Sequence, residues 1–518
     1  MKIIKFNQFA LLCLFIIIFS LTTVHASQDN LTSESMEIDD TLQNPSFDLA
    51  SEITNSKNGD EILIPEGTYT INNLEITKNL TIKGNGESRN VIIDGEKKDS
   101  IFLIRSDAIH VSFKNITFIN ANTDGFGGAI SIETGHVYVD NCNFINNSAG
   151  VNAGGISNYG NSEQKGYLFV NNSFFMNNHA NHDGGAITTC YANSDIYNCV
   201  FIDNFAHRDG GAIRVSVAGY GNVQDCIFMF NHADEWGGAY YSWSGESNIE
   251  RCIFMNNTAG TNGGAVMVSG NLNLEDSIIV NNNGGETGGS FYIQQPMYDA
   301  KTIINVHNNI ITNNSSPYGQ EIFVKWKDIK NLYTKFDDND WGDEDPNDSS
   351  INDPNNVTSR IKVSRTIKSD LFNRLNVNLL DKYRDLLGNY FTDESFDNLK
   401  NQFNHNASNN ERTNNNQNSN ENVKIKNTSS TKIAIKNNSS RNLETKSNEN
   451  SKIVSDNYNN LIIGNSSSHG EDEKAYELNE TGGSAVKQIN SEEKYFIVAI
   501  IIALILLVIG YKRNKKEE

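Results

Sequence analysis

Acidic, basic and aromatic side chains recur at matching places in three successive sequence repeats, and together they hold the groups needed to bind or cleave a sugar. Just before a Gly-Gly pair, the three repeats read His182-Asp183, His207-Arg208-Asp209 and Asp234-Glu235-Trp236. Just after the pairs, one shared position is occupied by Thr188, Arg214 and Tyr241, with Trp243 close by. The candidate binding residues, here called the corner patch, are Asp183, Arg208, Asp209, Arg214, Asp234, Trp236, Tyr241 and Trp243.

Each residue type in the corner patch favours a particular ligand chemistry. Guanidinium groups form paired hydrogen bonds to carboxylates, and aromatic faces suit sugar rings, so an acidic polysaccharide or a partner cell surface is the expected ligand. The acids Asp183, Asp209 and Asp234, stepped about 4.8 Å apart along stacked strands, could share a calcium ion or orient the arginines. We expect no other cofactor and no other metal.

Three interpretations of the corner patch stay open at this stage. The plainest is a solvated corner with paired charges, the second is a binding site and the third is a catalytic site. An inverting glycoside hydrolase would need two carboxylates about 6.5–9.5 Å apart. A polysaccharide lyase would need carboxylates that hold calcium and an arginine or lysine as base. If the patch acts, we expect it to bind rather than cut, so no residue is assigned as catalytic and the protein is expected not to be an enzyme.

Gly-Gly pairs reveal the repeat that must position the corner patch. They start at residues 127, 154, 184, 210, 237, 263 and 288, with spacings of 27, 30, 26, 27, 26 and 25 residues. The unit between them reads C-x-F-x-N-N-x-A, and G-G-A-I follows. Three apolar columns run through the units, and short β-branched or aromatic stretches of this kind indicate strands. The columns are Val139, Val170, Ile196, Val223, Ile249 and Leu274, then Phe144, Phe175, Phe201, Phe228, Phe254 and Ile279, then Ile130, Ile156, Ile187, Ile213 and Val266.

A strand of this length cannot bury itself, but copies stacked turn upon turn pair in parallel and make each column a continuous core stripe. The predicted fold is therefore all-β, a right-handed parallel β-helix over residues 47–345 with three short strands in each turn of about 27 residues. The Gly pairs are expected at a corner that needs positive φ or a close approach of the backbone between turns. A ladder of stacked side-chain amides, hydrogen-bonded along the axis, is expected from Asn147, Asn178, Asn204, Asn231, Asn257, Asn282 and Asn314. Buried thiols are expected at Cys142, Cys199, Cys226 and Cys252.

The two ends of the chain indicate export and membrane anchoring. Residues 1–26 have the basic start, apolar stretch and small-residue end of a signal peptide cleaved after Ala26. Residues 495–511 are uncharged and precede the basic tail 512–518, which predicts a single-pass membrane helix, a cytoplasmic tail and an extracellular β-helix. The formal net charge of −21 argues against nucleic acid as a partner.

The remaining segments connect these parts. Residues 27–46 are expected to be a linker, 346–400 an acidic linker with a short amphipathic helical segment, and 401–494 an asparagine-rich disordered stalk. The helical spacing covers 369–387, which is expected to pack on the base of the β-helix or to pair with a neighbour. A solvated linker is favoured over a calcium site for the acidic cluster Asp337, Asp338, Asp340, Asp343, Glu344, Asp345 and Asp348.

The alternation of G-G-A-I with F-x-x-N resembles the repeats of the chlamydial polymorphic outer-membrane proteins and, more closely, those of archaeal adhesin-like surface proteins. The resemblance covers about residues 47–345 and includes G-D-x-I-x-I-P-E-G-T-Y at 59–69 and Trp341-Gly342. It implies a right-handed β-helix of the pectin-lyase-like class at a cell surface. We therefore expect a membrane-anchored, adhesin-like protein that binds other cells or polysaccharide. The alternative function is a surface polysaccharide lyase or glycoside hydrolase, because the same fold hosts such enzymes.

Overall fold

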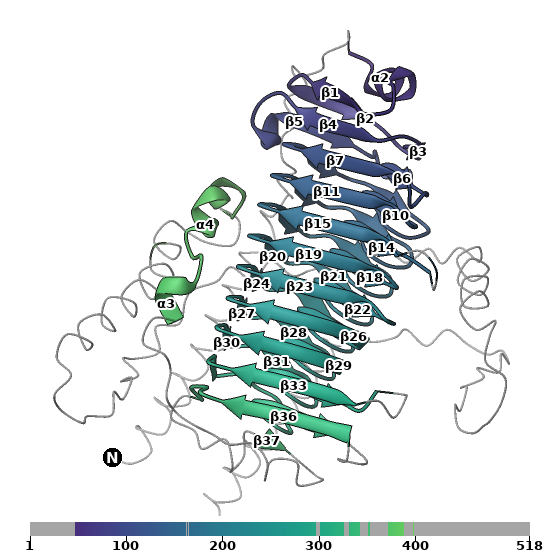
Figure 1. The fold of residues 1–518 in the computed structure, drawn as a ribbon. Coiled ribbons are helices and arrows are strands. Elements are labelled where there is room, and N and C mark those ends of the chain that lie inside the picture. The colour runs from purple at the N-terminus through teal and green to yellow at the C-terminus, as the bar shows by residue number, and fades with distance from the viewer. Residues whose placement is uncertain are drawn as a thin grey trace, which may run out of the picture. The chain divides into compact units, whose positions relative to one another are not determined.

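The computed structural model describes residues 47–161, 163, 165–296, 301–325, 331–341, 351–352, 371–387 and 397. In them, short strands stack as successive rungs of a β-helix, from β1 (Asp60–Ile64) near one end to β36 (Leu332–Asp337) near the other (Figure 1). Each strand pairs in parallel with its copy on the next turn, as β12 (Asn143–Ile145) does with β16 (Phe174–Met176). The predicted all-β parallel β-helix is confirmed.

The strands form four ladders. The first contains β3 (Leu74–Glu75), β6 (Phe102–Ile104), β10 (Ile130–Ile132), β14 (Ile156–Tyr159), β18 (Ile187–Cys190), β22 (Ile213–Ser216), β32 (Phe291–Gln294), β35 (Ile322–Lys325) and β37 (Ile351–Asn352). The second contains β1, β4 (Leu80–Gly84), β7 (His110–Lys114), β11 (His136–Asp140), β15 (Tyr167–Asn171), β19 (Asn193–Tyr197), β23 (Tyr220–Gln224), β33 (Thr302–His307) and β36. Both belong to one sheet because β26 (Tyr240–Glu250) and β29 (Val266–Glu275) run through the two ladders.

Two smaller sheets complete each turn. The third ladder contains β2 (Gly67–Thr70), β5 (Val91–Asp94), β8 (Thr117–Ile119), β12, β16, β20 (Val200–Ile202), β24 (Ile227–Met229), β27 (Ile253–Met255), β30 (Ile278–Val280) and β34 (Ile310–Thr312). The fourth contains β9 (Asn122–Thr123), β13 (Ser148–Ala149), β17 (His179–Ala180), β21 (Phe205–Ala206), β25 (His232–Ala233), β28 (Thr258–Ala259) and β31 (Asn283–Gly284).

The expectation of three strands per turn was therefore wrong by one. The additional strand is the fourth ladder, whose members are two residues long and carry a single inward residue, such as Ala149 or Ala180. A column of alanines gives little apolar signal, so the sequence showed only the three columns of larger side chains. These three columns lie in the first three ladders, as predicted.

In the second repeat, the Gly-Gly pair at residue 154 placed the predicted corner one residue too late. The first glycine of most pairs has positive φ, for example 67° at Gly127 and 64° at Gly184, as expected. In the second repeat this position is occupied by Ala153, at φ 62°, and strand register pairs Ile130 with Ile156. The pair at residues 154 and 155 therefore follows the corner and does not form it.

The core confirms the predicted columns. The phenylalanine rings stack along the helix, with centroids 4.7 Å apart for Phe144 and Phe175 and 4.8 Å apart for Phe175 and Phe201. These separations match the rise between stacked strands. The five cysteines of the described residues are free and buried, and four of them form the expected column: Cys142, Cys199, Cys226 and Cys252.

The asparagine ladder is also confirmed. The amide of Asn204 donates to Asn231 Oδ1 at 2.9 Å and to the Phe175 carbonyl at 3.0 Å, so it links neighbouring turns. The same pattern runs from Asn147 to Asn314, where the buried Glu321 accepts the last amide hydrogen bond at 2.7 Å. Each amide therefore satisfies backbone and side-chain groups that would otherwise be buried without partners.

Two short helical parts cover apolar surfaces of the β-helix. At its beginning, α2 (Leu49–Asn55) buries Leu49 and Ile53 against the core, and Asp48 caps it by accepting the Ser51 N–H at 3.1 Å. The sequence analysis did not predict this helix. A short 3₁₀ turn, η2 (Ser88–Asn90), lies between β4 and β5.

The second helical part is α3 (Leu371–Arg374), α4 (Leu379–Lys382) and η6 (Arg384–Leu387). It does not pack on the base of the β-helix but along its side, on the outer face of the third ladder. Tyr383 stacks on Phe174 with centroids 4.7 Å apart and donates to the Asn172 carbonyl at 2.6 Å. The helical segment packs there because strands of the third ladder have apolar residues on both faces. Their outer residues and the helical segment form one hydrophobic cluster. It includes Ile119, Phe174, Val200, Ile227, Ile253, Leu371, Leu375, Leu380 and Leu387.

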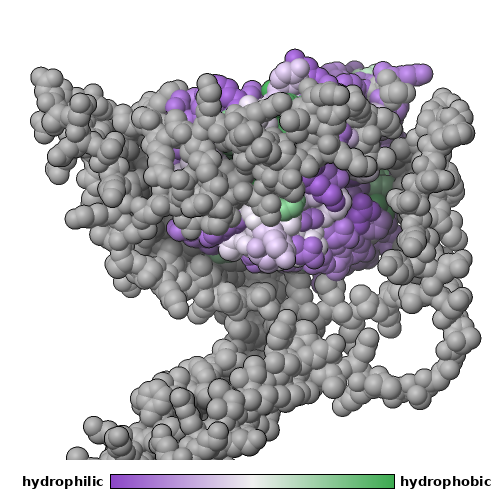
Figure 2. Space-filling view, turned by 90° about the horizontal axis from the view of Figure 1, so that it is seen from below, coloured by the Kyte–Doolittle hydropathy of each residue, from purple (hydrophilic) through white to green (hydrophobic). Residues whose placement is uncertain are grey.

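The view from below shows a mostly hydrophilic described surface with small pale and hydrophobic patches (Figure 2). Within the described residues, no helix is long and apolar enough to cross a membrane. The predicted signal peptide, N-terminal linker, stalk, membrane helix and tail (1–26, 27–46, 401–494, 495–511 and 512–518) lie outside the described residues.

Candidate functional site

The corner patch lies where the fourth ladder turns into the first. Gly184, Gly210 and Gly237 begin this turn with φ of 64°, 68° and 66°. A Cβ at Gly210 would lie 2.5 Å from the Ile213 carbonyl oxygen, so a side chain at this position would be strained. The turn brings the residue before each glycine into line with its copies, and Asp209 bridges in parallel to Trp236.

The charged groups of the patch form a buried quartet. Arg214 Nη1 lies 3.1 Å from Asp183 Oδ2, Arg208 Nε lies 3.6 Å from Asp183 Oδ1, and Arg208 Nη2 lies 3.8 Å from Asp209 Oδ2. Asp183 and Asp209 are each 3% exposed and Arg214 is 8% exposed, whereas 45% of the Arg208 side chain is exposed. Three of the four charges are thus removed from solvent.

This burial corrects the expectation of a solvated corner. Arg214 stands on β22, all four residues of which are buried, so both faces of the first ladder are covered at this turn. The sequence located the residues beside glycines and treated the corner as surface. It could not show that the outer face of this ladder is buried.

Several polar atoms of the quartet lack hydrogen-bond partners. Among the described residues these include Asp183 Oδ1, Asp209 Oδ1 and Arg214 Nε, all inaccessible to solvent. Burial, followed by the negative charge of Asp183, raises the pKa of Asp209 to about 7, although Arg208 and Arg214 act in the opposite direction. Asp209 therefore changes its charge near neutral pH, and buried polar atoms without partners are typical of a site that a further group completes.

The aromatic residues of the patch belong to a longer strip on the outer face of the first ladder. Strand register places Met267, Tyr292 and Phe323 in the column of Arg214 and Tyr241. Tyr241, Met267 and Tyr292 form a buried cluster, against which the partly buried Trp236, Trp243 and Phe323 pack. The sequence analysis missed this extension, although continuing the column by one repeat at a time would have found it.

Tyr241 is buried and cannot offer its face to a sugar. Its ring centroid lies 6.2 Å from that of Trp236, and burial, then the Asp209 charge, raises the pKa of its hydroxyl. Trp236 and Trp243 are only half-buried. The predicted aromatic contacts to a ligand are therefore limited to the two tryptophans.

Asp234 does not join the other two acids. Trp236 occupies the column of Asp183 and Asp209, so Asp234 lies two residues away, beside His207. Its Oδ2 lies 2.8 Å from His207 Nδ1 and its Oδ1 lies 3.0 Å from His232 Nε2. The predicted row of three acids, which could have shared a calcium ion or oriented the arginines, is therefore not formed, since the third position holds an indole.

Comparison with known proteins supports the repeat architecture. A family model described as the Chlamydia polymorphic membrane protein repeat matches residues 251–269, from the bend before β27 into β29. The predicted resemblance to the chlamydial repeats is confirmed for this stretch. It covers less than one turn of the β-helix, and the resemblance to archaeal adhesin-like proteins stays a prediction.

Several solved polysaccharide lyases resemble the chain at low identity. A PL6 alginate lyase in complex with a trisaccharide is 14% identical, with 62% of this chain and 80% of that chain covered and a TM-score of 0.34. A mannuronic acid specific polysaccharide family 6 lyase from the human gut microbiota is 12% identical, with 64% and 93% covered and a TM-score of 0.33. The PL6 family polysaccharide lyase from Pseudopedobacter saltans is 12% identical, with 61% and 91% covered and a TM-score of 0.31. Similarity at this level gives no basis for assigning lyase activity to this chain.

Proposed function

We propose that this protein is an adhesin-like protein of the cell surface, a binding module and not an enzyme, whose β-helix binds an acidic polysaccharide or a partner cell surface at the corner patch. The observation that carries the proposal is the placement of Arg208. Its guanidinium lies between the buried carboxylates of Asp183 and Asp209, at 3.6 and 3.8 Å, while 45% of the side chain is exposed. A guanidinium held in this way keeps donors for a ligand carboxylate and loses little conformational freedom on binding.

The charge of the quartet also favours an anionic ligand. Arg214 and Asp183 balance one another through their 3.1 Å contact, which leaves Arg208 and Asp209. With the Asp209 pKa at about 7, this carboxyl is substantially protonated at and below neutral pH, so the positive charge of Arg208 is not fully offset. A ligand carboxylate would supply the missing negative charge.

Trp236 and Trp243 provide the second part of the proposed site. Both are half-buried and pack against the aromatic strip, so their rings are held in place beside the charged groups. Fixed aromatic rings next to a cation suit a chain of sugar rings that carry carboxylates.

The Arg208→Ala variant is expected to bind an immobilised polyuronate at least about tenfold more weakly than the unchanged protein, because a hydrogen-bonded charge pair is lost. Retention of the detergent-solubilised full-length protein on polyuronate and on a neutral glucan measures the effect. Arg105→Ala is the matched control, since Arg105 is also about half exposed, at 44%, and pairs with Glu133 at 2.9 Å far from the patch. Equal retention of the two variants would contradict the proposal.

The same assay has a pH arm. Protonation of Asp209 favours an anionic ligand, so retention should fall by roughly tenfold as the pH rises from about 5.5 to about 8.5, through the Asp209 pKa of about 7. Asp209→Asn should remain neutral and keep its binding at the higher pH. If this variant loses retention with pH as the unchanged protein does, Asp209 is not the group responsible for the pH dependence.

Glycan cleavage is a second candidate that one observation favours. A carboxyl that is protonated near neutral pH, as the raised pKa of Asp209 implies, is the state needed for a general acid. Its 3% exposure and the pairing of Asp183 with Arg214 argue against direct contact with a glycosidic bond. Soluble oligosaccharide products that depend on Asp209 would replace the binding function with an enzymatic one.

The proposed surface location predicts a defined membrane topology. If residues 495–511 span the membrane and the basic residues after them stay inside, protease added to intact cells should remove the β-helix. An epitope fused after Glu518 should remain protected until the cells are opened. Digestion of the epitope in intact cells would exclude this orientation.

A further inference from the structure

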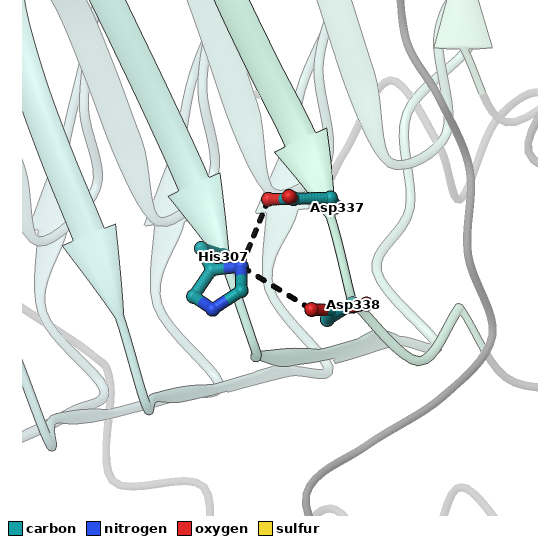
Figure 3. Close-up of side chains that lie close together, drawn as sticks. All are labelled: His307, Asp337 and Asp338. Carbon is teal, nitrogen blue, oxygen red and sulfur yellow. Dashed lines mark hydrogen bonds and ion pairs between the residues drawn. The ribbon is translucent and has the colours of Figure 1, made fainter.

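A second group of polar side chains lies at the last turns of the β-helix, outside the corner patch. His307 ends β33, Asp337 ends β36, and strand register places the two residues side by side. His307 Nδ1 lies 2.8 Å from Asp337 Oδ1 and 3.8 Å from Asp338 Oδ2, and the three side chains converge in Figure 3. The three candidate ligand atoms all lie within 4.8 Å of one another.

These separations fit a metal ion of the transition series. Ligand atoms about 2.0–2.1 Å from a tetrahedral ion are about 3.4 Å apart, because the ligand–metal–ligand angle is near 109°. The observed 2.8 and 3.8 Å lie on either side of that value, so small side-chain rotations would bring the three atoms to ligand positions. His307 and Asp337 end paired strands of neighbouring turns, which sets their spacing, and Asp338 follows β36 directly.

The donor set distinguishes between classes of ion. Calcium takes six to eight oxygen ligands, whereas an imidazole nitrogen suits zinc and similar transition-metal ions, which also accept carboxylate oxygens. For the acidic cluster from Asp337 to Asp348, the sequence favoured a solvated linker over a calcium site. The structure adds a nitrogen ligand from a different turn to its first two acids, and Asp343 to Asp348 lie outside the described residues.

Lys335 lies beside the proposed ligands. Lys335 Nζ contacts Asp337 Oδ2 at 3.1 Å, so the other oxygen, Oδ1, is the one that faces His307. Burial raises the pKa of Asp337, but Lys335 and His307 outweigh it and hold this pKa below its usual value. A carboxylate must be ionised to bind a metal, and this direction of the Asp337 pKa favours the ionised form.

We propose that His307, Asp337 and Asp338 bind one zinc-like divalent transition-metal ion, which ties the last two long strands of the β-helix together. These three residues supply three ligands and leave room for water as the fourth. Within the described residues β36 pairs with β33 alone, so the ion would stabilise this end of the described solenoid. The site is independent of the proposed function of the corner patch.

The test uses the full-length protein after treatment with a chelator. Equilibrium dialysis should show that the unchanged protein takes up one zinc ion, and zinc should raise the midpoint of thermal unfolding by at least about 3 °C. His307→Ala and Asp338→Asn should each weaken zinc uptake at least about tenfold and remove the thermal shift. Calcium at the same concentration should give no shift.

His207→Ala is the matched control, because His207 also contacts an aspartate at 2.8 Å but lies outside this group. It should retain zinc uptake and the full thermal shift. The more conservative Asp338→Asn keeps the size of the side chain, so it tests the site even if His307→Ala folds poorly. Absence of zinc uptake by the unchanged protein, or equal uptake by His307→Ala, would overturn the proposal and leave a simple ion pair.

Discussion

Replacing Arg214 by methionine is expected to lower the free energy of unfolding by about 3–5 kcal/mol, since it removes the nearest cation from a buried carboxylate. Arg214 lies 3.1 Å from Asp183, which is 3% exposed, and the next guanidinium, that of Arg208, is 3.6 Å away and partly in solvent. Methionine fills a similar volume, so most of the loss comes from the unpaired charge and little from a cavity. Urea unfolding monitored by circular dichroism measures the effect.

A double change separates the charge from the packing. Asp183→Asn combined with Arg214→Met removes both charges, so it should recover at least half of the lost stability. Arg105→Met, at an exposed ion pair, should cost less than about 1 kcal/mol. A cost of that small size for Arg214→Met as well would show that the quartet is solvated, as the sequence alone had suggested.

The same burial changes how binding variants are interpreted. From the sequence alone, replacing Arg208, Arg214 and Trp236 together by alanine would be expected to leave the free energy of unfolding nearly unchanged. Corner side chains are expected to contribute little to the core. Since Arg214 is 8% exposed and paired, such a variant would lose stability and binding together. Arg208, with almost half of its side chain exposed, is the residue that tests binding separately.

The repeat could be predicted because its residues act within one turn or between adjacent turns. When phenylalanines recur at a nearly constant sequence spacing, stacking the repeats in parallel places every ring on its copy in the next turn. The ring centroids of Phe201 and Phe228 are 4.8 Å apart in the structure. The ladder of asparagines follows for the same reason. The alanine column of the fourth ladder was missed because alanine contributes too little apolar area to distinguish a strand from a bend.

Register errors explain which features of the candidate site the sequence did not predict. Grouping by residue type placed Asp234 with Asp183 and Asp209, whereas counting back from Gly237 places Trp236 in that column. The contact of His307 with Asp337 depends on a turn of 30 residues that carries no Gly-Gly pair, so no spacing rule connected them. The position of residues 371–387 on the third ladder depends on the outer faces of many turns at once, which no single repeat reveals.

Replacing Asn231 by alanine is expected to lower the free energy of unfolding by about 3–5 kcal/mol. Its side-chain Nδ2 donates to the Phe201 carbonyl at 3.0 Å and to Asn257 Oδ1 at 2.9 Å. Its Oδ1 accepts from the backbone N–H of Asn204 at 3.1 Å and from the side-chain Nδ2 of Asn204 at 2.9 Å. Alanine would leave buried donors and acceptors on the turns above and below without partners. Because each turn stabilises its neighbours, the loss should interrupt cooperativity along the helix.

Asn248 provides the matched control for this prediction. It lies on β26 in an outward-facing row of asparagines. Its side-chain amide donates to Asn222 Oδ1 at 2.9 Å, and its Oδ1 accepts from the Asn273 amide at 2.9 Å. Because Asn248 is only half-buried, water can replace both hydrogen bonds. Asn248→Ala should therefore cost less than about 1 kcal/mol. Hydrogen exchange should show loss of amide protection on the turns around residue 231 in Asn231→Ala only. Equal costs for the two variants would mean that the inward ladder is no more important than a surface row of asparagines, and that the apolar columns alone hold the turns in register.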